Sequence, residues 1–169
     1  MNIEVKSATL VASAAVGAAR VSLGVLWLHE GLFKYGAHFG RADILLVVDS
    51  AKSNSRVPDY FAALAEFTLR ARPGLFGFVI PLLETWLGIA LIVGVLSLPA
   101  AIASLLTLMT YWSSDQLIAQ YPIMGALSAV IIAWPLLAAR FSATSLIVWV
   151  LERTQRAARL IRGPQRRWL

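Results

Sequence analysis

Hydrophobic residues are concentrated in four long stretches of the chain, and most of the charged residues lie outside them. Each stretch approaches the ~20 residues that an α-helix needs to cross a membrane. The predicted spans are residues 9–33, 75–98, 99–119 and 122–139. Proline fits the first turn of a helix and disrupts its interior, so Pro99 and Pro122 mark the starts of the last two helices. The short turns at these prolines make neighbouring helices antiparallel, and the pattern predicts an all-α, integral membrane four-helix bundle over residues 1–151.

The connection between the first two stretches, residues 34–74, is long and holds six basic and four acidic residues. Within it, residues 58–70 fit an amphipathic helix that lies in the membrane interface or caps the bundle, in the first extracytoplasmic loop. The apolar positions that share one side of this helix are Phe61, Leu64, Ala65 and Leu69. Residues 141–151 fit either a second interfacial helix or a continuation of the fourth span.

The composition agrees with a membrane protein. Hydrophobic residues make up 59% of the 169 positions and charged residues only 14%, whereas a soluble domain carries about 25% charged residues. Small residues around Ala12–Ala18 also fit a signal-peptide cleavage site. However, the only positive charge before them is Lys6, and the apolar pattern continues to Phe33, so we expect a retained span.

The net charge of +6 comes from the end of the chain, where seven arginines from Arg140 onward face a single acid, Glu152. A basic tail beside apolar helices predicts a cytoplasmic end that contacts anionic lipid. We therefore expect a multi-pass protein of the cytoplasmic (inner) membrane, with both termini in the cytoplasm and residues 152–169 as a basic tail. A basic tail without a recognition module does not indicate a nucleic-acid partner.

Five ionisable residues lie inside the predicted spans, where each costs about 2.5–3.5 kcal/mol at a helix centre, so a partner or a use is expected. They are Arg20, His29, Glu30, Glu84 and Asp115. Glu84 is the only acid in the second span, and a buried arginine needs a carboxylate. We predict an Arg20–Glu84 contact in the bundle core, which either fixes helix register or takes part in chemistry.

The other ionisable residues lie nearer the outer face. His29, Glu30 and Asp115, together with Lys34, are predicted to line a cavity open to that side. Glu30 and Lys34 are four residues apart, so a simple pair along the helix is the alternative.

Tryptophans are the candidates for contact with a flat ligand. Trp27, Trp86 and Trp112, together with Tyr111, fit either an aromatic belt at the membrane surface or the wall of a ring-binding site. The chain has no cysteine and two histidines, so we expect no haem, metal or flavin in this chain.

Two segments resemble the DoxX-like family of membrane proteins. The run from Arg20 to Lys34 (RVSLGVLWLHEGLFK) is similar to the opening helix of that family, with its arginine, glycine, aromatic residue and Gly-x-x-Lys. The run from Glu84 to Gly94 (ETWLGIALIVG) is similar to its second helix. Around Ala139–Ser142 the family has glycines where this chain has alanines, and the acid that often follows is absent. The long first connection is similar to that of the DoxD-type branch.

The resemblance implies a four-helix protein of the cytoplasmic membrane, related to the membrane subunit of a thiosulfate:quinone oxidoreductase, with Arg20, Glu84 and Lys34 as shared residues. We therefore expect a quinone-linked subunit in which Glu84 carries protons, Arg20 tunes its charge and the tryptophans pack on the ring. Such a chain would need other protein subunits. The alternative is a non-catalytic membrane anchor or assembly subunit, and a small transporter is less favoured because the spans show no inverted repeat.

Overall fold

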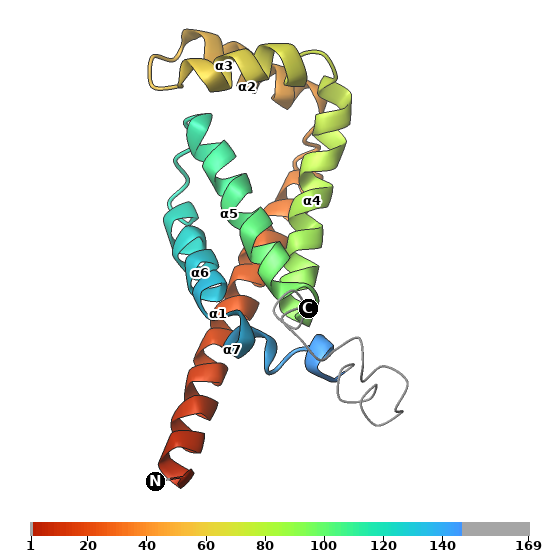
Figure 1. Cartoon of the computed structure of the whole chain (residues 1–169). Helices are drawn as coiled ribbons and strands as arrows, with labels where there is room; N and C mark the ends of the chain where they lie inside the picture. The colour runs from red at the N-terminus through yellow and green to blue at the C-terminus, as the bar shows by residue number, and fades with distance from the viewer. Residues whose placement is uncertain (1, 147–169) are drawn as a thin grey trace, which may run out of the picture.

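The computed structural model of the chain describes residues 2–146, and every regular element in this part is a helix. The long helices run alongside one another, and the short helices α2 and α3 cross one end of them (Figure 1). The elements in chain order are α1 (Asn2–Gly36), α2 (Arg41–Ser53), α3 (Asp59–Leu64), a π-helical turn η1 (Ala65–Leu69), α4 (Pro73–Val93), α5 (Ser97–Ser113), α6 (Tyr121–Ala133) and α7 (Pro135–Ala139). The predicted tail, residues 152–169, and positions 147–151 lie outside the described residues.

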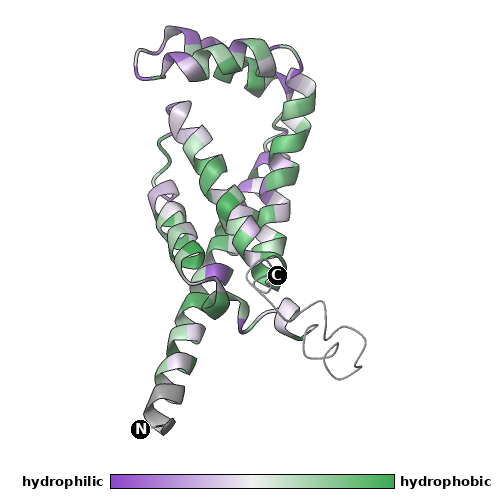
Figure 2. Cartoon of the chain, viewed as in Figure 1, coloured by the Kyte–Doolittle hydropathy of each residue, from purple (hydrophilic) through white to green (hydrophobic). Residues whose placement is uncertain are grey.

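Within residues 2–146, two helices are long and apolar enough to cross a membrane, Ser7–Gly36 of α1 and the whole of α4. These two form the largest interface between elements. Glycines allow their backbones to approach closely: a Cβ on Gly88 would lie 2.6 Å from the Leu28 nitrogen, and one on Gly24 would lie 2.8 Å from the Ile92 nitrogen. Figure 2 shows the apolar character of α4 along most of its length.

The third and fourth predicted spans are shorter in the structure. Helix α5 ends at Ser113. Two residues later, Asp115 takes a left-handed backbone conformation with φ of 61°. The stretch predicted as one helix over residues 122–139 is interrupted at Trp134, because Pro135 lacks an N–H and clashes with the preceding turn. The prediction of a single continuous helix there is wrong, and α6 and α7 take its place.

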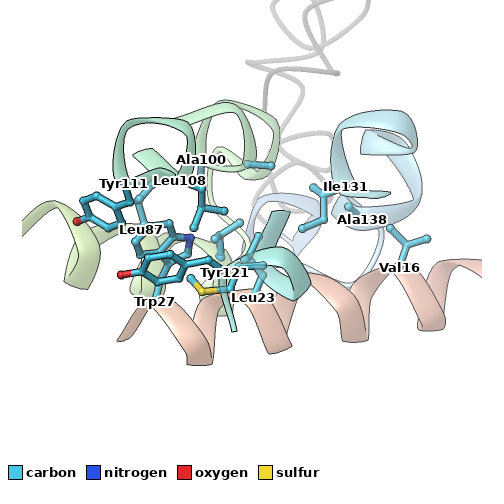
Figure 3. Packing of buried hydrophobic residues seen from close by; sticks show 13 residues of the cluster. Val16, Leu23, Trp27, Leu87, Ala100, Leu108, Tyr111, Tyr121, Ile131 and Ala138 are labelled. Carbon is cyan, nitrogen blue, oxygen red and sulfur yellow. The ribbon is translucent and has the colours of Figure 1, made fainter. Parts of the chain in front are cut away.

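The bundle core is built around three aromatic rings. Trp27 and Tyr111 have ring centroids 6.4 Å apart, and Tyr111 stacks on Tyr121 at 5.5 Å (Figure 3). The Trp27 indole N–H donates to Ser104 Oγ at 2.7 Å, and Ser104 pairs with Ser128 at 2.8 Å. This chain of hydrogen bonds joins α1, α5 and α6 in the interior.

Helices α2, α3 and η1 form a unit that we call the helical cap. The amphipathic helix expected over residues 58–70 is present as α3 and η1, with Phe61 and Ala65 buried and Leu64 half exposed. Helix α2 was not predicted and packs against both η1 and α4. The cap has its own small apolar core, made of Val48, Ala51, Val57, Phe61 and Ala65.

Candidate functional site

A charged cluster lies between α1 and α4, below the cap. The Lys34 ammonium is 2.6 Å from Glu84 Oε1 and 3.3 Å from Glu30 Oε2. Glu84 is fully buried and Glu30 is 6% exposed. One lysine therefore bridges two carboxyl groups that are shielded from solvent.

Two tyrosines and a glutamine extend the cluster onto α5 and α6. The Tyr111 hydroxyl donates a hydrogen bond to Glu84 Oε1, the oxygen that also binds Lys34. The Gln120 amide donates to Glu30 Oε1, and the Tyr121 hydroxyl lies 3.5 Å from Glu30 Oε2. Polar groups from α1, α5 and the start of α6 thus converge on two carboxyl groups, one on α1 and one on α4.

The second oxygen of Glu84 is left without a partner. Among the described residues, Glu84 Oε2 and the Ser97 hydroxyl are the buried side-chain oxygens that no hydrogen bond reaches. A buried polar atom without a hydrogen bond costs about 1–3 kcal/mol in proteins. Glu84 therefore retains capacity for a proton, a water molecule or a ligand.

A cavity of about 370 Å³ adjoins the cluster, between the cap, α4 and α5. Lys34 and Tyr111, which both bind Glu84, form part of its wall. The remaining wall is mainly apolar and aromatic, with several hydroxyl groups from α5. Its aromatic members are Phe39, Phe61, Phe76 and Tyr111. The Lys34 ammonium also lies 5.4 Å from the centroid of the Tyr111 ring.

Arg20 does not contact Glu84, so the predicted ion pair is wrong. Its guanidinium donates instead to backbone carbonyls, at 3.1 Å to Ala138 and 2.9 Å to Phe141, and also to Leu91 and Ile92 near the end of α4. The last carbonyls of a helix lack intrahelical partners and carry partial negative charge, so they can replace a carboxylate.

The register of α1 against α4 explains this difference. Gly31 lies against Pro81 and Thr85, and Gly24 lies against Gly88 and Ile92. This register places Glu84 opposite the part of α1 that holds Glu30 and Lys34. Arg20 precedes Lys34 by 14 residues, or ~21 Å along the helix, and so meets the end of α4 instead.

The other predicted site residues are dispersed. His29 is exposed and stacks on Phe33. Asp115 binds Asn54 at 2.7 Å and Arg56 at 2.5 Å, so it ties the cap to the end of α5 rather than lining the cavity.

The tryptophans do not form a wall of this cavity. Trp86 is 62% exposed on the outside of α4, and Trp27 is sealed in the core. Trp112 is 37% exposed and faces Gly125, where a Cβ would lie 3.2 Å from its ring. The aromatic side chains that line the cavity are Phe39, Phe61, Phe76 and Tyr111, and of these only Tyr111 was among the residues predicted for such a wall.

Sequence reasoning missed Gln120 and Tyr121 as members of the cluster. A tyrosine hydroxyl inside an apolar helix needs a hydrogen-bond partner, and this signal was available for Tyr111 and Tyr121. Nothing in the local sequence marked Gln120, because its role depends on the tertiary position of Glu30. Comparisons of the chain with protein-family models, curated proteins and solved structures give no match.

Proposed function

We propose that the chain is a DoxX-like subunit of the cytoplasmic membrane that binds a quinone in the cavity beneath the helical cap and supplies it with protons. The observation that carries this proposal is the position of Lys34 and Tyr111. Both side chains line an apolar cavity and both bind the buried Glu84. A ligand in the cavity would therefore lie next to groups that can donate hydrogen bonds.

A membrane location is supported by what the long helices expose. Large apolar side chains cover the outward faces of α1, α4, α5 and α6, a distribution that would promote aggregation in water. Examples with more than half of their surface exposed are Val25, Leu32, Phe33, Phe78, Trp86, Leu106 and Ile123. In this proposal α5, which is ~26 Å long for its 17 residues, and the α6–α7 pair complete a four-helix membrane bundle. The arginine-rich end then places both termini in the cytoplasm.

The cavity fits a quinone ring in size and chemistry. Its volume of about 370 Å³ is within the range of roughly 300–1,000 Å³ that is typical of small-molecule sites. A lysine ammonium has three N–H donors, and the hydrogen bonds to Glu84 and Glu30 use two of them. The third is available for a ring carbonyl, while Phe39 and Phe76 offer apolar surfaces for the ring.

Reduction of a quinone to a quinol consumes two electrons and two protons. The electrons would come from a redox subunit bound to this chain. Glu84 and Lys34 would orient the ring and pass protons to its oxygens, and the apolar wall would exclude bulk water. This role assigns proton delivery to the present chain and electron delivery to its partner.

A non-catalytic anchor or assembly subunit is the second candidate. Three alanines share one exposed face of α6, Ala126, Ala129 and Ala133, and small residues on one face favour close packing of another membrane helix. By contrast, Gly77 and Gly88 already pack within the chain, against Gly40 and Leu28.

Photolabelling with an azidoquinone in lipid nanodiscs tests the quinone site. We expect the label on cavity residues of the cap, α4 and α5. A Thr107→Trp exchange fills the cavity and should reduce labelling at least tenfold. The matched control is Leu106→Trp on the same helix, which adds the same ring at a position that is 59% exposed and should leave labelling unchanged. Equal labelling of both variants, or label confined to the outer faces of the helices, would overturn the proposal.

A further inference from the structure

We infer that Glu30, Lys34 and Glu84 form a proton-binding site that holds one exchangeable proton at neutral pH and exchanges it through the α5–α6 end of the bundle. This inference deepens the proposed function and rests on it only for the use made of the proton. The site itself would exist whether or not a quinone binds.

Charge counting gives the first argument. Two carboxylates and one ammonium leave a net charge of −1 when both acids are ionised. In the described part of the chain, no second cation lies within ion-pair distance of either carboxyl group. An uncompensated charge in a protein interior is expensive, and one added proton brings the cluster to neutrality.

The hydrogen bonds give the second argument. Both donors that reach Glu84 bind its Oε1, and its Oε2 has no partner in the described residues. An ionised carboxylate offers about four acceptor sites and normally fills them when buried. A carboxyl group that carries a proton on the second oxygen requires fewer donors.

The groups around the two acids come from three helices, and the acids themselves lie on α1 and α4. Helix α1 contributes Lys34, α5 contributes Tyr111, and α6 contributes Tyr121 beside Gln120 at its start. All except Lys34 are uncharged hydroxyl and amide groups. Lys34 contacts both carboxyl groups, so it is the shared counter-ion through which the protonation of one acid affects the other.

The position of the cluster sets the route of the proton. Gln120 is partly exposed at the turn between α5 and α6 and binds Glu30. Lys34 connects Glu30 to Glu84 and lines the cavity. A proton that arrives at the turn thus reaches Glu30 first and the cavity last, so Glu30 is the entry group, and Glu84 reaches the cavity through its partners Lys34 and Tyr111.

Infrared spectroscopy of the purified chain in nanodiscs tests the site without any quinone or electron donor. The C=O stretch of a protonated carboxyl group is separate from that of a carboxylate and shifts in D₂O. We expect one protonated carboxyl per chain at neutral pH. The signal should vanish in Glu84→Gln and also in Glu30→Gln, because either exchange leaves one acid paired with Lys34. Lys34→Met should double the signal and Lys34→Arg should preserve it.

Asp115→Asn is the control, since this acid lies outside the cluster and pairs with Arg56; it should leave the signal unchanged. Absence of the signal in the wild-type protein would overturn the inference, and so would its loss in only one of the two glutamine variants, which would indicate a single isolated acid. The glutamine exchanges and Lys34→Arg preserve size closely, so the test does not depend on whether Lys34→Met folds. Loss of azidoquinone labelling with a retained signal would contradict the proposed function alone.

Discussion

Lys34 and Glu84 form an ion pair across the α1–α4 interface, with 2.6 Å between Nζ and Oε1, at a depth where Glu84 is fully buried. Lys34 and Tyr111, the two side chains that bind Glu84, both line the cavity. The pair therefore couples the interior of the bundle to the place where a ligand would bind.

The first prediction concerns Glu84. A Glu84→Gln exchange keeps an acceptor for Tyr111 but removes the group that gains and loses a proton. Proton transfer by a positioned side chain contributes roughly 10²–10⁴-fold to a rate, so quinone reduction by the native complex should fall at least about 100-fold. The rate is followed by the absorbance change of the quinone. Asp59→Asn at the exposed start of α3 is the control, because this acid does not line the cavity, and it should retain activity. Full turnover in Glu84→Gln would remove Glu84 from the mechanism.

The second prediction tests the close approach of α1 and α4. A Cβ at Gly88 would meet backbone atoms of Leu28 at 2.6–2.8 Å, which cannot move without separating the helices. Gly88→Ala should therefore lower the free energy of unfolding by about 1–3 kcal/mol. Gly17→Ala on α1 is the control, because a Cβ there meets nothing within 4 Å. Thermal unfolding in detergent measures both, and equal stability of the two variants would contradict this packing.

The helices could be predicted from the sequence because hydrophobic stretches and prolines are local signals. Pro99 lies in the first turn of α5 and Pro122 in that of α6, as expected. Pro135 carried the same information, but the apolar composition around it masked the break. Helix α2 also had a usable signal, since Ile44, Val48 and Ala51 recur at helical spacing and are buried.

The side-chain contacts of the site depend on the register of α1 against α4, which the sequence indicates only weakly. Arg20 and Glu84 carry opposite charges on neighbouring helices, so a prediction based on charge alone pairs them. The register is set by glycine contacts such as those of Gly31 and Gly88, which shift α4 so that Glu84 meets Lys34. Backbone carbonyls, which are invisible in a sequence, supply the partners of Arg20.

The third prediction follows from the separation of Arg20 and Glu84. Arg20→Gln leaves buried carbonyls of α4 and α7 without donors, at a cost of about 1–3 kcal/mol for each group. Glu84→Gln should change the free energy of unfolding separately, because it removes the charge that binds Lys34. Since the two residues share no partner, the effects should add within about 0.5 kcal/mol in the double variant. A coupling energy above about 1 kcal/mol in thermal or denaturant unfolding would instead support a direct ion pair.

The fourth prediction concerns the cap and pH. Hydrogen bonds from Lys52 and Arg70 hold the pKa of the Glu66 carboxyl below its usual range, and Arg70 also binds Asp49 on α2. A carboxyl whose pKa is lowered in the folded state contributes stability above its unfolded value, about 4.3 for glutamate, and loses it as the pH falls through the lowered value. The packing of η1 on α2 should therefore loosen below about pH 4.

Pulsed EPR measures this loosening, because the chain has no cysteine of its own and nitroxides can be attached at single introduced sites. With labels at the exposed positions Ala42 of α2 and Ala63 of α3, the distance distribution should be narrow at neutral pH and broaden in acid. Glu66→Gln should be broad already at neutral pH, because it lacks the charge that binds Lys52 and Arg70. A narrow distribution in acid together with a narrow one in Glu66→Gln would show that these ion pairs do not hold the cap, and that its apolar core around Phe61 does so alone.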